Sequence, residues 1–208
     1  MRKFLITLSL MLMTMSSNLF AQGITPGKEV DLGLPSGTIW AGWNVGASSP
    51  EEYGGYYAWG ETEEKSVYNW DTYKYRASQL GEYVNIGSNI SGTQYDVARQ
   101  KWGVSWRVPT IAEVDELISK CTWIWYEYKG VNGYKVTGPN GNSIFLPAAG
   151  HSLNSEIIYG SYWSASLYEG NDNDGTFACF LGFYYGSISS NGYNSRMDGN
   201  TVRPVKSK

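Results

Sequence analysis

Histidine and cysteine, two of the side chains most often used as catalytic bases, nucleophiles and zinc ligands, are almost absent from this sequence. Its 208 residues include a single histidine, His151, and two cysteines. A zinc site or a nucleophile–base–acid triad needs several such partners at defined geometry. We therefore expect His151 to be a surface or hydrogen-bonded residue, and we predict that the protein is not an enzyme.

The two cysteines, Cys121 and Cys179, allow one disulfide at most. In an exported chain such a bridge would persist, and closing a loop of this length contributes roughly 4 kcal/mol in the chain-entropy model. The alternative is that both are small buried hydrophobic residues, because Cys121 falls on the apolar side of a predicted helix and Cys179 in a predicted strand. We favour the alternative, and the sequence leaves both open.

Long hydrophobic runs are also missing, except at the N-terminus. Phe4 to Met15 is an apolar run that follows Arg2 and Lys3 and precedes a short polar stretch ending at Ala21. This order is typical of a secretory signal peptide, which we predict at residues 1–21. No later stretch is apolar enough to cross a membrane. We expect an exported protein that is periplasmic, cell-surface or extracellular.

An excess of basic residues is missing too. Removing Arg2 and Lys3 from the 16 basic residues leaves 14 against 19 acidic residues, a net charge of about −5 for residues 22–208. The basic residues form no cluster except in the tail from Arg203 to Lys208. Nucleic acid is therefore a poor candidate partner. Residues 22–208 are few enough to form one domain around one core.

Aromatic residues and glycine are abundant, with 9 Trp, 17 Tyr and 25 Gly. Tyrosine among Gly, Ser and Asn is the composition of binding surfaces, since its ring offers rigid contact area with a polar tip. Tyrosine also favours β-strands, which is an equally good explanation.

The strongest helix signal covers residues 111–121. Thr110 precedes it as an N-cap, and Glu113 is placed to complete a capping box. One face of this helix is apolar and must be buried, and it consists of Val114, Leu117, Ile118 and Cys121.

The other elements are weaker. A short helix is expected at 95–102, ended by Gly103. Residues 45–95 lack periodicity, which predicts a long irregular segment. We expect its aromatic side chains to anchor it to the rest of the domain, namely Tyr56, Tyr57, Trp59 and Trp70. Alternation and turn residues predict strands at 29–32, 38–43, 123–128, 133–137, 143–147, 160–166, 176–184 and 200–205, with the last beside the first hairpin.

The segment Trp106-Arg107-Val108-Pro109-Thr110-x-x-Glu113 resembles the signature of the bacterial Fibrobacter-type major paralogous domain and the related DUF1566 group. Further segments match in order along the mature chain, at residues 30–38, 44–47, 57–62, 142–150, 162–164 and 202–205. The resemblance implies an α+β, C-type-lectin-like fold with two short helices, a small mixed or antiparallel sheet and a long irregular loop region. The biochemical role of that family is largely unassigned.

The segment 107–113 also resembles, more distantly, the helix start of the formylglycine-generating enzymes, which share that fold. Those enzymes need a reactive cysteine pair. Cys121 and Cys179 do not stand in a matching context, so the resemblance does not carry that chemistry over.

Residues Gly170 to Gly175 are the best candidate for a cation site. Asp172 and Asp174 lie among asparagines before a glycine turn, and closely spaced oxygens of this kind can bind calcium. The spacing does not fit a helical calcium-binding loop, and a polar turn between strands explains the composition equally well. We expect no other cofactor.

The stretch 184–200 has the composition of an antibody combining site. We predict that it forms a loop whose side chains bind a ligand, although an ordinary polar loop and edge strand is the alternative. An aromatic platform for sugars would have Trp59, Trp70 and Tyr68 as its candidates, and burial of the Trp residues in the core is the favoured alternative. The predicted ligand-binding residues are Tyr184, Tyr185, Asn191, Tyr193, Asn194, Arg196, Asp198 and Trp59.

These patterns favour a secreted or surface-associated binding module for a glycan or protein ligand outside the cytoplasm. One alternative is a structural or fimbrial component of the cell envelope. Another is an enzyme of unknown reaction, in which two of the carboxylates of Glu51, Glu52, Glu61 and Glu63 would face each other across a cleft.

Overall fold

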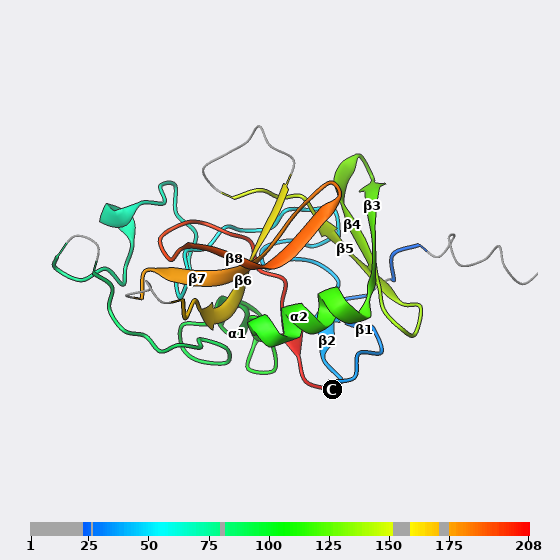
Figure 1. Cartoon of the computed structure of the whole chain (residues 1–208), viewed down its shortest axis with the longest axis horizontal. Coiled ribbons are helices and arrows are strands. Elements are labelled where there is room, and N and C mark those ends of the chain that lie inside the picture. The colour runs from blue at the N-terminus through cyan, green and yellow to red at the C-terminus, as the bar shows by residue number, and fades with distance from the viewer. Residues whose placement is uncertain (1–22, 26, 80–81, 152–158, 171–174) are drawn as a thin grey trace, which may run out of the picture.

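The computed structural model describes residues 23–25, 27–79, 82–151, 159–170 and 175–208. The predicted signal peptide, residues 1–21, and the calcium candidates Asp172 and Asp174 lie outside these ranges. The described part contains two α-helices and three small antiparallel sheets, so the chain belongs to the α+β class, as predicted (Figure 1). Neither of these helices has the length and hydrophobicity that a membrane span requires.

Helix α2 (Ile111–Lys120) begins where its capping residues predicted. Thr110 Oγ1 accepts a hydrogen bond from the backbone N of Glu113 at 3.3 Å, and the Glu113 carboxylate accepts one from the backbone N of Thr110 at 2.9 Å. The apolar face is buried at Val114 and Leu117 and partly buried at Ile118 and Cys121. The predicted capping box and apolar face are both confirmed.

The first sheet joins the two ends of the described chain. Strands β1 (Glu29–Asp31) and β2 (Ile39–Ala41) form the predicted hairpin, and β9 (Val205–Lys206) pairs with β2. The Arg203 side chain, buried just before β9, donates hydrogen bonds to Asn44 Oδ1 at 2.7 Å and to the backbone oxygens of Ala41 and Phe145. The predicted pairing of the C-terminal strand with the first hairpin is confirmed, but the strand predicted at 200–205 comprises only Val205 and Lys206.

The second sheet has the order β3-β4-β5 and consists of Thr122–Tyr128, Val131–Thr137 and Ser143–Pro147. Strand β5 is buried throughout, whereas β3 is partly exposed along its length. No described strand pairs with the outer edge of β3.

The third sheet has the order β6-β7-β8 and consists of Tyr159–Leu167, Phe177–Tyr184 and Ser187–Ser195. Strand β8 pairs with β7 along most of its length and forms the edge of the sheet. The prediction of a loop over 184–200 is therefore wrong for residues 187–195, which form an edge strand. Polar residues are compatible with this strand because only one of its edges and part of one face are covered.

The segment 45–95 is irregular, as predicted, and its one helical turn among the described residues is the 3₁₀ helix η1 (Trp70–Thr72). Helix α1 (Val97–Trp102) follows, with Asp96 as its N-cap and Gly103, at a φ of 99°, after its last residue. The short helix was predicted from residue 95 and begins two residues later, because the Asp96 side chain caps it.

Two clusters of buried side chains form most of the core. The first lies between α2 and the three sheets and includes Trp40, Leu117, Tyr134, Ile144, Tyr162 and Phe183. The second packs the irregular segment and α1 against β6 and includes Val45, Tyr57, Trp59, Val97, Trp163 and Val202. Cys121 and Cys179 are both half-buried and are not joined by a disulfide.

Candidate functional site

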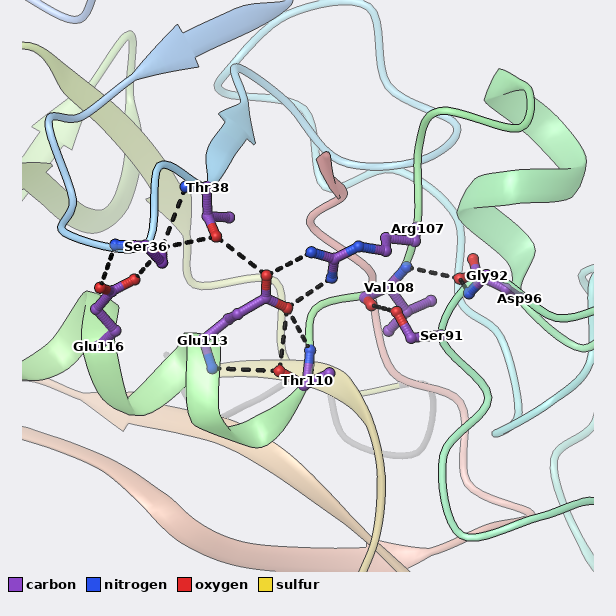
Figure 2. Close-up of polar contacts among 10 residues, drawn as sticks. All are labelled: Ser36, Thr38, Ser91, Gly92, Asp96, Arg107, Val108, Thr110, Glu113 and Glu116. Atoms are coloured by element: carbon purple, nitrogen blue, oxygen red, sulfur yellow. Dashed lines mark hydrogen bonds and ion pairs between the residues drawn. The ribbon is translucent and has the colours of Figure 1, made fainter. Parts of the chain in front are cut away.

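The segment that carries the family resemblance forms a network of polar contacts at the N-terminal end of α2 (Figure 2). Arg107 donates from both terminal nitrogens to the two carboxylate oxygens of Glu113, at 2.6 Å each. The same carboxylate accepts bonds from Thr110 and, at 3.1 Å, from Thr38 Oγ1. Burial alone would raise the pKa of Glu113, but the bonds from Arg107 and Thr110 outweigh it and lower that pKa.

Asp96 forms the second half of this network. Its buried carboxylate accepts from the backbone nitrogens of Gly92 at 2.7 Å, Val108 at 2.9 Å and Arg99 at 3.0 Å. Burial raises the pKa of Asp96 despite these bonds. The carboxylates of Asp96 and Glu113 thus bind neighbouring segments of their own chain, which makes the segment 106–113 a structural junction.

Each of the four glutamates proposed for an enzymatic cleft has a partner within the fold. Each of them interacts with a different residue: Glu51 with Lys129, Glu52 with Ser48, Glu61 with Lys65 and Glu63 with Lys101. Within the described ranges, no three His, Cys, Asp or Glu side chains are grouped so that they could hold a metal ion.

Trp59 and Arg196 do not lie on a surface where a large ligand could reach them. Trp59 is buried, and its indole Nε1 donates to the backbone oxygen of Ser164 at 3.0 Å. Arg196 is 2% exposed. The predictions that these two side chains contribute to an exposed binding face are wrong, because the irregular segment folds over both.

Other predicted residues also fail to share one face. Asn194 points toward the interior, where its Nδ2 donates to Asn200 Oδ1 at 3.3 Å, and Asp198 is half-buried, so that burial raises its pKa. Tyr193 is 46% exposed and stacks on Tyr168 with ring centroids 4.2 Å apart. Asn191 is exposed on the same strand.

The remaining two residues, Tyr184 and Tyr185, lie at the turn between β7 and β8 and are the most exposed tyrosines described, at 59% and 73%. The ring of Tyr185 packs edge-on against that of Trp125 on β3, with centroids 5.8 Å apart. We call the surface formed by Trp125, Tyr184 and Tyr185 the aromatic surface. It joins the tip of the third sheet to the edge of the second.

Tyr134 holds the aromatic surface in place from below. Its hydroxyl donates to the backbone oxygen of Tyr184 at 3.2 Å and accepts from the backbone N of Gly186 at 3.1 Å. Its ring lies edge-on to Trp125 at 5.1 Å. The turn is therefore fixed to β4 at two points, and the exposed rings are carried by a rigid support.

The opposite face of β3 carries a second group of exposed residues, which is separate from the aromatic surface because successive side chains of a strand point to opposite sides of the sheet. Ile124 and Tyr126 are exposed, and Tyr126 stacks near Tyr128 with centroids 6.3 Å apart. The sequence predicted the strand, but the contact between Trp125 and Tyr185 joins residues distant in sequence, which no local pattern reveals.

Comparison with protein-family models, curated proteins and solved structures gives no match for this chain. The family resemblance stated from the sequence stays a prediction.

Proposed function

We propose that the chain is an exported, non-enzymatic binding module with a C-type-lectin-like fold. On this proposal it recognises a glycan or protein ligand outside the cytoplasm through the aromatic surface of Trp125, Tyr184 and Tyr185. The observation that carries the proposal is the exposure of two adjacent tyrosines on a turn that Tyr134 holds by two hydrogen bonds.

Exposed aromatic rings on a rigid support are suited to recognition. A fixed tyrosine offers a large contact area and loses little conformational entropy when a ligand binds. Ring faces stack on sugars as well as on apolar side chains, so the same surface suits either ligand class. The carboxylates of Glu51, Glu61, Glu63 and Glu113, by contrast, each pair with a basic side chain of the fold, which supports binding over catalysis.

The test is a screen of residues 22–208 against glycans and extracellular proteins, followed by a double variant, Tyr184→Ala with Tyr185→Ala. We expect the variant to keep its melting temperature within a few degrees and to lose at least about tenfold in affinity, because side chains at the centre of an interface typically contribute more than 1 kcal/mol each. The control is Tyr193→Ala, which removes an exposed tyrosine at the other end of β8. Unchanged binding in the double variant, or equal loss in the control, would refute the assignment of the site.

One observation favours a second candidate function, that of a structural subunit. The outer edge of β3 carries aromatic and β-branched residues and has no paired strand among those described. Such an edge can add a strand from another chain. Light scattering after size-exclusion chromatography tests this idea. Ordered polymers that Ile124→Lys disperses would support it, and a monomer at high concentration would contradict it.

A further inference from the structure

A buried guanidinium lines a pocket that lies apart from the aromatic surface. Arg196 directly follows β8. It lines a pocket of about 370 Å³ together with Tyr83, Asn85, Gly87, Ser88, Leu167 and Gly175. Arg196 is the one charged side chain in this set of lining residues.

The position of the guanidinium is fixed by its surroundings. The backbone N of Arg196 donates to Thr176 O at 3.0 Å, and the backbone O of Arg196 accepts from Trp59 N at 2.8 Å. The guanidinium carbon lies 5.0 Å from the ring centroid of Trp59, 5.6 Å from that of Tyr73 and 5.1 Å from that of Tyr83. These rings stabilise the cation and hold its plane in place.

The hydrogen bonds of Arg196 leave donors unused. Its Nε donates to Tyr73 Oη at 3.1 Å, one terminal nitrogen to Gly175 O at 3.0 Å and the other to Val84 O at 3.1 Å. A guanidinium has five N–H groups, so one on each terminal nitrogen remains.

Among the residues that the structure describes, Arg196 has no partner of opposite charge. The three acceptors are neutral, and burial raises the pKa of Tyr73, which keeps that phenol protonated. A buried charge without a counter-charge is costly, and an anion in the pocket would lower that cost.

Arg203 provides an internal comparison. It is also buried and donates to three neutral oxygens, and burial lowers its pKa to about 10. Neutral acceptors and tight packing are therefore enough to hold an arginine in this fold as a structural residue. Arg196, in addition, lines a pocket.

We infer that this pocket binds a small organic carboxylate, whose two oxygens accept the remaining N–H groups of Arg196. A guanidinium and a carboxylate match in geometry, and their paired hydrogen bonds are stronger than those between neutral groups. The other lining residues are uncharged, and Leu167 and Tyr83 provide apolar surface for the rest of the ligand. The volume suits a small molecule. This inference does not depend on the proposed function of the aromatic surface.

Titration calorimetry with benzoate and with benzamide tests the inference, because the two probes share a ring and differ in charge. We expect benzoate to bind at least about tenfold more tightly than benzamide, since only the carboxylate pairs with the guanidinium.

The matched variants are Asn85→Asp and Asn89→Asp. Asn85 follows Val84, whose carbonyl accepts from Arg196, and Asn85 Oδ1 accepts from Gly87 N at 2.9 Å. Asn89 makes the equivalent bond to Ser91 N at 2.8 Å but does not line the pocket. Aspartate preserves either bond. We expect N85D to weaken benzoate binding at least about tenfold by repelling the carboxylate and competing for Arg196, and N89D to bind as the wild type does.

Three results would overturn the inference. The first is equal binding of benzoate and benzamide, which would make the pocket merely apolar. The second is the absence of benzoate binding at tens of millimolar. The third is an affinity for benzoate that N85D leaves unchanged, or that N85D and N89D reduce by the same factor. Both variants keep Arg196, so the test does not depend on a variant that unfolds.

Discussion

Replacing Glu113 by alanine is expected to destabilise the fold by about 2–4 kcal/mol. Loss of the capping box at Thr110 accounts for about 1 kcal/mol. The rest comes from Arg107, whose guanidinium loses both of its 2.6 Å bonds and its only ion-pair partner among the described residues. Breaking a fully buried pair costs about 3–5 kcal/mol. We take about half of this, because the Arg107 side chain keeps 25% of its exposure to water.

Urea denaturation followed by circular dichroism gives the free energy of unfolding, and the loss should lower the melting temperature by about 5–15 °C in a chain of this size. The control is Glu116→Ala on the same helix. Glu116 bonds only to the exposed Ser36, at its backbone N and hydroxyl, so its loss should cost under about 1 kcal/mol. If the two variants differ by less than about 0.5 kcal/mol, Glu113 does not join the helix to Arg107 and Thr38 in the way described.

Three further predictions follow from burial and pKa. Arg196→Ala should destabilise the fold by about 3 kcal/mol or more, since it leaves buried acceptors unpaired, whereas Tyr185→Ala should cost under about 0.5 kcal/mol; equal losses in urea denaturation would contradict the burial of Arg196. Burial raises the pKa of Cys121 to about 12, so iodoacetamide at neutral pH should alkylate it at least about a hundredfold more slowly in the folded than in the urea-unfolded chain, measured by mass spectrometry of peptides. The pKa of Glu113 is lowered by folding, so its contribution to stability is present above about pH 4.5 and is lost as the pH falls. The difference in unfolding free energy between wild type and Glu113→Gln should therefore narrow in acid, and a constant difference would refute this sign.

The elements that were predicted from the sequence are those whose signals are local. Thr110 and Glu113 are three residues apart and need only each other to start a helix. The hairpin of β4 and β5 is likewise fixed by its turn, where Gly141 takes a φ of 88°. Strand β8 was ambiguous because Ser, Asn and Tyr suit a loop and a half-covered edge strand equally well.

The candidate site was harder to predict because its contacts are long-range. Tyr185 meets Trp125 only when two sheets come together. Arg196 is buried by Trp59, Tyr73 and Tyr83, which lie in a segment without periodicity. The exposure expected from this composition is confirmed for Tyr184 and Tyr185 and is wrong for Arg196, since composition does not report which side chains a distant segment covers.

The placement of β9 beside β2 has a consequence for the order in which the protein can fold. Arg203 and its acceptor Asn44 are 159 positions apart, so the sheet of β1, β2 and β9 cannot close until residues 205 and 206 have been made. Contacts of such sequence separation form slowly, whereas α2 and the β3–β4–β5 meander need only nearby residues. The N-terminal strands should thus be synthesised first and become structured last. Removing the final few residues should expose the beginning of the chain to proteases rather than merely fray its end.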